Sequence, residues 1–347
     1  MKILIVTDAW HPQVNGVVRT IEATARELAA AGHVCTYITP QSFYTLPCPG
    51  YSEIRLSLLP YRRVAKTIAA EAPDAIHLAT EGPLGQAARR YCLRHGLPFT
   101  TAYHTRFPQY LRAMYGVPER WTYGFLRRFH GAAARVLSPT GEMDRDLAAI
   151  GIERIARWTR GVDLATFSPQ AGEAPAVADL PRPRFLYVGR VSVEKNIGAF
   201  LALDLPGSKI VAGVGPELER LRRLHPEVRF VGLLERPALA QLYSSVDAFV
   251  FPSRTDTFGL VLLEALACGT PVAAYPVAGP LDVVGGSPAA CLNEDLRRAT
   301  LRALRIDRAL CRAHAERYSW RAATEQFVAL QERIERGSAV RAIAQAA

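Results

Sequence analysis

The segment FLYVGRVSVEKN, residues 185–196, decides the fold of the C-terminal half of the chain. Its first four residues are apolar and β-rich, which predicts a buried strand that ends at Gly189. Arg190 and Lys195 then fall on the loop and first helical turn beyond it, where open α/β sheets bind anionic ligands. Two cations there suit a diphosphate, because Arg can hold its oxygens in a bidentate fork and Lys adds a mobile charge. A solvated basic helix start is the alternative.

A second segment repeats this pattern further along the chain. The apolar run AFVFPS, residues 248–253, predicts another strand, and a helical pattern follows from Leu260 to Cys268. Asp256 lies at the mouth of that helix and Glu264 lies eight residues later, slightly more than two turns on, so both can reach one ligand. A carboxylate inside an apolar helix is costly unless it is paired or bonded to ligand hydroxyls. A salt bridge on the helix face is the other interpretation of Glu264.

Strands and helices alternate along the whole chain, which predicts doubly wound parallel sheets. A Pro-rich stretch that ends at residue 183 divides the alternation into two halves, as a linker between two domains would. We expect strands near 2–7, 34–39, 75–78, 98–103 and 134–138 in the first half, and near 184–188, 208–212, 228–231, 247–251 and 271–275 in the second. We expect helices in the first half near 17–31, 60–71, 84–95, 119–130 and 140–149.

Composition favours a cytosolic enzyme with two cores, since 347 residues exceed the usual size of one core. The N-terminal apolar run is too short for a signal peptide, and no apolar stretch is long enough to span a bilayer. We therefore expect a soluble or peripheral protein. Six scattered cysteines without a C-x-x-C pair indicate reduced thiols: Cys35, Cys48, Cys92, Cys268, Cys291 and Cys311.

The two C-terminal segments resemble family 4 of the retaining glycosyltransferases, whose pattern is Gly-Arg…Lys followed by Glu-x7-Glu with Phe-Gly after the first acid. Here the first acid is Asp256, which shortens the arm to the sugar. The variant Thr-Asp-Thr-Phe-Gly looks like the subgroup of GDP-mannose-dependent α-mannosyltransferases, sulfoquinovosyl-diacylglycerol synthases and bacterial glycosyl-diacylglycerol synthases. Most of the chain takes part in the resemblance, through TDAWHPQVNGVVRT (7–20), TAYHTRFPQYL (101–111) and RGVDLATFSP (160–169).

This resemblance implies the GT-B fold, an α/β architecture of two Rossmann-like doubly wound parallel-sheet domains facing a central cleft. We expect an acceptor-side domain over 1–165, a linker over 166–183, and a nucleotide-sugar-binding domain over 184–316. The segment 317–347 would hold a helix that starts at Tyr318, ends near 336 and crosses back to the first domain.

The resemblance also implies roles for individual residues. Arg190 and Lys195 would stabilise the departing diphosphate, Asp256 would contact the sugar, and His104 would position the sugar from the first domain. The expected donor-binding residues are Gly16, Arg190, Lys195, Leu234, Asp256, Phe258, Gly259, Leu260 and Glu264, and the acceptor would approach Trp10, Asn15, Arg106 and Tyr110. Gly16 in a plain turn, a structural His104 and a core Trp10 are the alternatives.

No metal or other cofactor is expected, because the cations can stabilise the leaving group and the only D-x-D string, Asp144-Arg145-Asp146, lies in a helical pattern. The chain carries a net charge of +10, and residues 1–170 hold 20 Lys and Arg against 13 Asp and Glu. This basic half, with the aromatic and basic segment ERWTYGFLRRFH (119–130), could lie on an anionic membrane. A core-facing aromatic stripe is the alternative. No nucleic-acid motif accompanies the charge.

We therefore expect a peripheral enzyme at the inner face of the cell membrane. It would transfer glucose or glucuronic acid from a UDP-sugar to a membrane glycerolipid, with diacylglycerol the preferred acceptor, and retain the anomeric configuration. The alternative is a GDP-mannose-dependent α-mannosyltransferase acting on a lipid or glycan. Because fold does not fix function, a nucleotide-sugar epimerase and a non-catalytic nucleotide-sugar sensor stay open.

Overall fold

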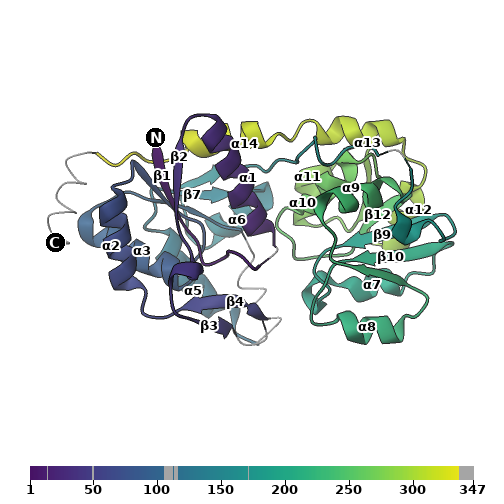
Figure 1. Ribbon diagram of the computed structural model, residues 1–347, viewed down its shortest axis with the longest axis horizontal. Helices are drawn as coiled ribbons and strands as arrows, with labels where there is room; N and C mark the ends of the chain where they lie inside the picture. The colour runs from purple at the N-terminus through teal and green to yellow at the C-terminus, as the bar shows by residue number, and fades with distance from the viewer. Residues whose placement is uncertain (14, 49–50, 105–111, 113–115, 171, 336–347) are drawn as a thin grey trace. The chain divides into compact units, whose positions relative to one another are not determined.

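The computed structural model describes residues 1–13, 15–48, 51–104, 112, 116–170 and 172–335, and the ribbon is drawn in Figure 1. The chain forms two compact units. Unit 1 comprises Met1–Thr159 together with the segment that starts at Trp320, and unit 2 comprises Arg160–Ser319. The chain therefore leaves unit 1, builds unit 2, and returns.

Unit 1 is built on a six-stranded parallel sheet in the order β2-β1-β5-β6-β7-β8. The strands are β1 (Lys2–Val6), β2 (Val34–Ile38), β5 (Ala75–Leu78), β6 (Thr100–Ala102), β7 (Arg135–Ser138) and β8 (Ile155–Arg157). Successive strands run outward from β1 on one side and from β5 on the other. The strand order thus reverses between β1 and β5, and the loops that follow these two strands meet at one edge.

The helices of unit 1 agree closely with the periodic segments of the sequence. They are α1 (Gly16–Ala30), α2 (Tyr61–Glu71), α3 (Pro83–His95), α5 (Glu119–His130), α6 (Gly141–Ala149) and α14 (Trp320–Ala329). Asn15 caps α1 by accepting hydrogen bonds from two backbone N–H groups, and Thr140 caps α6 by accepting one from the Met143 N–H. An antiparallel hairpin of β3 (Thr45–Cys48) and β4 (Tyr51–Ser57) separates β2 from α2, and the alternation pattern does not predict it.

Unit 2 has a second six-stranded parallel sheet, in the order β11-β10-β9-β12-β13-β14. Its strands are β9 (Arg184–Val188), β10 (Ser208–Ala212), β11 (Arg229–Gly232), β12 (Ala248–Phe251), β13 (Val272–Ala274) and β14 (Ala290–Leu292). Its helices are α7 (Ile197–Leu201), α8 (Leu218–Leu224), α9 (Arg236–Ser244), α10 (Leu260–Ala267), α11 (Ala278–Val284), α12 (Leu296–Ala303) and α13 (Arg308–Ala315). Numbered within the unit, this is the order 3-2-1-4-5-6 of a Rossmann sheet, which reverses between β9 and β12.

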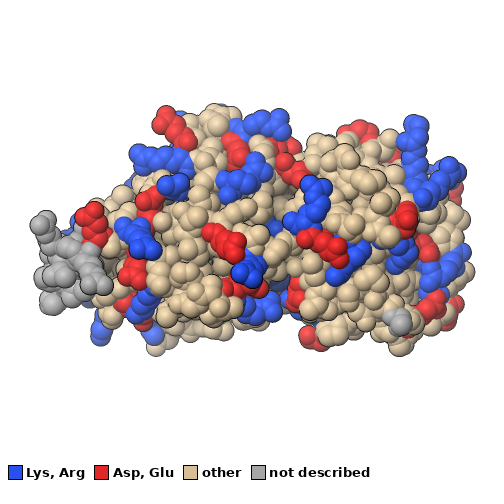
Figure 2. Space-filling model, turned by 90° about the horizontal axis from the view of Figure 1, so that it is seen from above, with Lys and Arg blue, Asp and Glu red and all other residues tan. Residues whose placement is uncertain are grey.

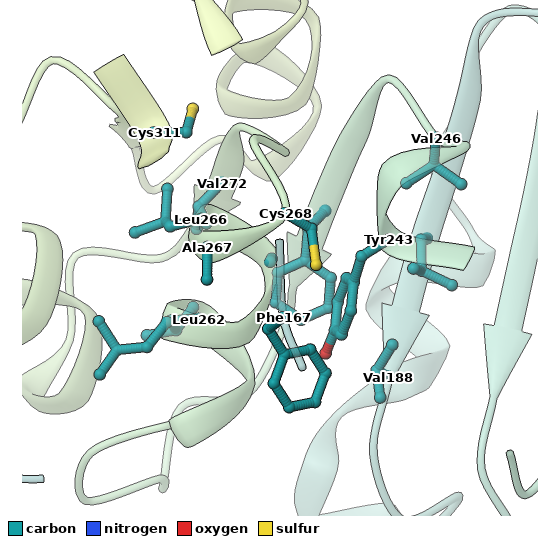
Figure 3. Packing of buried hydrophobic residues seen from close by; sticks show 14 of the residues in the cluster. Phe167, Val188, Tyr243, Val246, Leu262, Leu266, Ala267, Cys268, Val272 and Cys311 are labelled. Carbon is teal, nitrogen blue, oxygen red and sulfur yellow. The ribbon is translucent and has the colours of Figure 1, made fainter. Parts of the chain in front are cut away.

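Both faces of the unit 2 sheet are covered, so β9, β12 and β13 are buried along their whole length and are mostly apolar. Figure 3 shows one of these cores, in which Phe167, Tyr243 and Leu262 pack with the small residues of α10. The other face packs against α7 and α12 through Phe185, Phe200 and similar residues. These two close-packed cores, one on each face of the sheet, fix the ends of the strands and therefore the loops that follow them.

The prediction for the last helix was wrong in its length. A helix from Tyr318 to about 336 is expected from the sequence, but α14 begins at Trp320 and ends at Ala329. The residues beyond Ala329 bond to other parts of unit 1. Gln331 accepts a hydrogen bond from the Thr100 hydroxyl at 2.9 Å, and the Ile334 N–H donates to the Asp74 carbonyl at 2.8 Å. These tertiary bonds outweigh the helical propensity of the segment.

Candidate active site

The first predicted cation segment follows β9, a strand buried throughout. Arg190 lies on the loop after Gly189, and Lys195 closes a short 3-10 turn, Val193–Lys195, before α7. The Tyr187 hydroxyl donates to the Arg190 carbonyl at 2.7 Å, which fixes the backbone of the loop. Burial, and then the charges of Asp256 and Glu194, raise the pKa of Tyr187 well above its usual range. In the structure both cations lie beyond the carboxyl end of β9, at the edge of the sheet that the sequence predicts.

The second predicted segment follows β12 and leads into α10. Gly259 has a φ of +82° immediately before the helix, a left-handed conformation that favours glycine. Glu264 is buried within α10, and the Tyr243 hydroxyl donates to its Oε2 at 3.4 Å. Phe258 is buried, and its ring lies against that of Tyr318. Leu260, the first residue of α10, is partly buried against the core of this unit.

The two segments meet where the strand order of unit 2 reverses. Lys195 Nζ is hydrogen bonded to Asp256 Oδ1, so the predicted phosphate-binding cation and the predicted sugar-binding acid form an ion pair. Both side chains are partly exposed, at 28% and 20%. Two further bonds join the loops: the Thr255 hydroxyl donates to the Glu194 carbonyl at 3.2 Å, and the Asn196 amide donates to the Pro252 carbonyl at 3.0 Å. Two predicted donor residues that are 61 positions apart in the sequence are therefore in direct contact.

A third loop, after β10, packs against the first one and was missed at the sequence level. The Gly189 N–H donates to the Ala212 carbonyl at 3.0 Å, and the Val191 N–H donates to the Val214 carbonyl at 3.0 Å. Gly213 has a φ of +136°, and a Cβ built on it would lie 1.9 Å from the Gly189 carbonyl oxygen. The signal in the sequence is Gly213-Val214-Gly215 directly after an apolar strand, a pattern that permits such a close backbone approach.

Replacing Gly213 with alanine should therefore damage the site from outside it. The new methyl group must push the Arg190 loop away from β10, and the backbone at Gly213 is strained for any other residue. We expect at least tenfold weaker nucleotide-sugar binding in a titration and a lower thermal unfolding midpoint. Gly198→Ala, which adds a methyl group with nothing within 4 Å, is the matched control. Equal donor affinity in both variants would contradict this account.

Leu234, predicted to lie near the nucleotide base, follows β11 by two residues and is partly buried against the core of unit 2. Gly232, the last residue of β11, accepts a hydrogen bond from the Gly213 N–H at 2.7 Å. Hydrogen bonds therefore connect the loop after β9 to the loop after β10, and that loop to the end of β11, in the order of the strands.

His104 follows β6 in unit 1, and its ring centroid lies 5.9 Å from that of Trp158 in an edge arrangement. Trp158 is fully buried, donates from its indole N–H to the Ala323 carbonyl at 3.1 Å, and packs against Phe327. Helix α14 therefore packs against Trp158, and Trp158 in turn packs against His104. The histidine is partly exposed and lies at the carboxyl edge of its sheet.

The other residues predicted on the N-terminal side have clear local roles. The Asn15 side chain caps α1, and Gly16 is the first residue of that helix. Trp10 is partly buried and packs against Tyr37, with ring centroids 5.2 Å apart, and against His11. Arg106 and Tyr110 lie outside the described residues. Asn15 and Trp10 therefore also serve the fold of unit 1.

Asp8 is buried where the strand order of unit 1 reverses. Its carboxylate accepts hydrogen bonds from the Thr80 hydroxyl at 2.9 Å, from the Leu84 N–H at 2.9 Å and from the Gly85 N–H at 3.3 Å. Burial nevertheless raises its pKa to about 6. The acid therefore joins the loops after β1 and β5 and carries a desolvation cost when it is ionised.

This raised pKa predicts a pH-dependent stability. Between about pH 4 and pH 6 the folded state holds a proton on Asp8 that the unfolded state releases, so this contribution to stability is lost as the pH rises through 6. We compare the free energy of unfolding of Asp8→Asn with that of the wild type. The difference should shift in favour of the variant by roughly 1–3 kcal/mol when the pH rises from 4.5 to 7.5. Urea unfolding of both proteins at the two pH values measures the difference. A constant difference would show that Asp8 titrates normally.

Asp144 and Asp146 lie within α6, as their helical pattern predicts. The Asp144 carboxylate pairs with Arg157 at 2.6 Å. In the part of the chain that the structure describes, no group of three or more His, Cys, Asp or Glu residues is placed to hold a metal ion.

Models of two protein families match the chain, one for each half. The model of Glycosyltransferase Family 4 matches residues 14–166, and the model of Glycosyl transferases group 1 matches residues 182–305. The first match falls in unit 1, apart from its last residues, and the second contains all the residues of unit 2 that are predicted to bind the donor.

Curated relatives extend over most of the chain. A GDP-mannose-dependent alpha-mannosyltransferase from Mycobacterium tuberculosis is 30% identical over 82% of this chain and 81% of its own length. The sulfoquinovosyl transferase SQD2 from Arabidopsis thaliana is 32% identical over 93% of this chain and 72% of its own. An alpha-monoglucosyldiacylglycerol synthase from Streptococcus pneumoniae is 28% identical over 79% and 71%.

Solved structures share the fold at lower identity. A sucrose-phosphate synthase from Thermosynechococcus elongatus superimposes with a TM-score of 0.76 at 22% identity, covering 95% of this chain and 98% of the other. Anabaena HepE, solved with UDP and glucose, gives a TM-score of 0.70 at 16% identity over the same shares. The two parallel-sheet units are thus those of the GT-B fold, as the sequence predicts. Together with the relatives, these matches identify the chain as a hexosyltransferase that belongs to glycosyltransferase family 4.

Proposed function

We propose that this enzyme transfers a hexose from a nucleotide-diphosphate sugar to a membrane glycerolipid, with retention of the anomeric configuration. The observation that carries the donor half of the proposal is the ion pair between Lys195 and Asp256, which joins the two predicted donor segments where the sheet order reverses. We favour UDP-glucose or UDP-glucuronic acid as the donor and diacylglycerol as the acceptor. Two relatives, a sulfoquinovosyl transferase and a monoglucosyldiacylglycerol synthase, support a glycolipid product.

The chemistry of the donor bond sets the task of each residue. Breaking the bond between the anomeric carbon and the phosphate oxygen leaves negative charge on the diphosphate, so the transition state needs cations more than the ground state does. Arg190 and Lys195 would supply them. Glu264 would accept hydrogen bonds from the ribose hydroxyls, and Asp256 would contact the sugar. His104 would orient the sugar from unit 1.

The ion pair gives Asp256 a second task in this proposal. A lysine side chain is flexible, and a nearby carboxylate holds it in place before the donor arrives. When the diphosphate binds, Lys195 would bond to its oxygens, and Asp256 would be released to the sugar hydroxyls.

The proposed membrane contact rests on the surface of unit 1. Leu59 is 97% exposed with a left-handed φ of +45°, which is strained for a residue other than glycine. Helix α2 follows with Arg62 and Arg63 exposed in its first turn, where the helix dipole favours acidic residues. A strained, exposed leucine and arginines at a helix N-terminus both depart from local structural preferences, and such departures are typical of functional surfaces. An anionic bilayer would accept both the leucine and the arginines.

A second exposed group lies on α5. Trp121 is 66% exposed, Phe125 is also exposed, and Arg120, Arg127 and Arg128 surround them, whereas Phe129 is fully buried. The stripe of three aromatics is therefore split, with its last member in the core and its first two on the surface. On the face drawn in Figure 2, Lys and Arg are interspersed with Asp and Glu, so that face has no uniformly basic surface. None of the described helices is long and apolar enough to cross a membrane.

The proposal is tested by thin-layer analysis of lipid products. Purified enzyme is incubated with anionic liposomes that contain diacylglycerol and, separately, with UDP-glucose, UDP-glucuronate, UDP-galactose or GDP-mannose. A new glycolipid with a UDP-sugar supports the proposal. A glycolipid formed only with GDP-mannose would favour the alternative that the mycobacterial relative supports. Conversion of a donor without acceptor would indicate an epimerase, and donor binding without any product would indicate a sensor or a soluble acceptor.

A further inference from the structure

A buried histidine in unit 1 is not explained by the donor site. His130, the last residue of α5, is fully buried, and both of its ring nitrogens have partners. Nδ1 lies 2.9 Å from the Thr101 hydroxyl in β6, and Nε2 lies 3.2 Å from Glu81 Oε1. The tautomer with its proton on Nε2 satisfies both: the ring donates to Glu81 and accepts from Thr101. Because turning the ring would break both bonds, His130 fixes the position of Glu81.

Glu81 lies at the edge where ligands bind in sheets of this type. It follows β5 by three residues, next to the reversal of strand order between β1 and β5, and it shares the carboxyl edge of the sheet with His104. Its side chain is 17% exposed, so it has lost most of its water but keeps an accessible side. Among the described residues, no hydrogen bond is made by its second carboxylate oxygen, Oε2.

The neighbouring acid shows what a purely structural carboxylate does at this edge. Asp8 is buried, and its two oxygens accept hydrogen bonds from the Thr80 hydroxyl and from two N–H groups of α3. Oε2 of Glu81 has no such partner among the described residues and is partly accessible, so water or a ligand supplies its hydrogen bond. Glu81 combines an anchored oxygen with one that can take a hydrogen bond from outside.

The surroundings also indicate which ligand this is. Asp8 and Glu81 lie close enough for the charge of Glu81 to contribute to the raised pKa of Asp8. Two acids would repel a diphosphate, and the cations predicted for the diphosphate are in unit 2. A carboxylate accepts hydrogen bonds, and a hydroxyl group, which the acceptor of a hexose must present, can donate one to it.

We propose that Glu81 binds the acceptor hydroxyl, with His130 and Thr101 as positioning residues behind it. This inference rests on the proposed function, since it assumes that the acceptor is a lipid with a hydroxyl group. Glu81 makes its hydrogen bond in the ground-state complex, so its contribution is to the affinity for the acceptor.

Glu81→Gln tests the proposal, because it keeps the shape of the side chain but presents an amide. At saturating UDP-sugar we expect the KM for diacylglycerol in liposomes to rise about tenfold, equivalent to about 1.4 kcal/mol. The dissociation constant of the UDP-sugar should stay within twofold, and kcat should change much less than KM. Thr101→Val and His130→Phe should raise the same KM about threefold, and the former keeps the test informative if the latter does not fold.

The matched control is Glu71→Gln, which removes a carboxylate paired with Lys2 at the opposite end of the unit 1 sheet. It should leave the KM for diacylglycerol unchanged. A KM within twofold of the wild type in Glu81→Gln would overturn the inference and leave the proposed function intact. An equal rise in the donor dissociation constant would assign Glu81 a structural role. If the wild type makes no glycolipid from any donor, the proposed function fails first, and the inference fails with it.

Discussion

Glu264→Ala should abolish hexose transfer while leaving the protein folded. Glu264 is buried in α10, and a buried carboxylate is expensive unless its oxygens are bonded. The Tyr243 hydroxyl donates to its Oε2 at 3.4 Å, and in the proposed function the ribose hydroxyls donate to the same carboxylate. Alanine removes this charge and is the best helix former, so α10 should tolerate it. We expect turnover below the limit of detection in a product assay and a thermal midpoint within a few degrees of the wild type.

Two controls separate this prediction from a general loss of structure. Glu219→Ala removes an exposed glutamate on α8 and should leave turnover unchanged. A titration with the free nucleotide should show weaker binding in Glu264→Ala only. If that variant retains wild-type activity, Glu264 is a packing residue, and the donor site has been assigned to the wrong helix.

Lys195→Ala should lower kcat by about 10²–10³-fold, the usual effect of removing one preorganised charge from a developing anion. Lys195 lies at the end of a 3-10 turn and is held by Asp256, so it is already positioned when the donor arrives. Because the charge of the diphosphate grows as the bond breaks, kcat should fall more than donor affinity. Steady-state kinetics with the donor identified by product analysis measure both. A loss of less than tenfold would place the main phosphate contact elsewhere.

The ion pair complicates this experiment, since Lys195→Ala also leaves Asp256 without its cation. The double variant Lys195→Ala, Asp256→Asn resolves the problem. If the loss came only from an unpaired Asp256, the second change would restore activity. We expect no recovery, because the diphosphate still lacks its cation. Lys209→Ala is the matched control, since Lys209 lies near the start of β10 and bonds to the Leu201 carbonyl.

The fold of both units could be predicted because their strands are short apolar runs that end in Gly or polar residues. The segment after β9 is an example: Phe185 to Val188 fill one strand, and Gly189 ends it. The β3–β4 hairpin was missed because Pro47 interrupts its first strand, and the clear alternation of its second strand is confined to four residues, Ile54 to Ser57. The end of α14 was missed because tertiary hydrogen bonds from Gln331 and Ile334 decide it, and local propensity does not contain them.

The sequence shows where the predicted donor residues lie along the chain but not how they contact one another. Lys195 and Asp256 each follow a strand, and the sequence shows this directly. That they form an ion pair depends on β9 and β12 being neighbours, a property of strand order that spacing along the chain does not reveal. The same holds for His130 and Glu81, which are 49 residues apart and meet only because α5 ends beside the loop after β5.

The return of the chain to unit 1 has a consequence for synthesis on the ribosome. Unit 2 can fold as soon as Ser319 has emerged, whereas unit 1 still lacks α14. Until that helix docks, Trp158 has neither the Ala323 carbonyl to bond nor the Phe327 ring to pack against. His104 packs against Trp158, so its final surroundings also form only when α14 docks. The first unit to be translated is thus the last to be finished, and an incomplete chain lacks the support of His104.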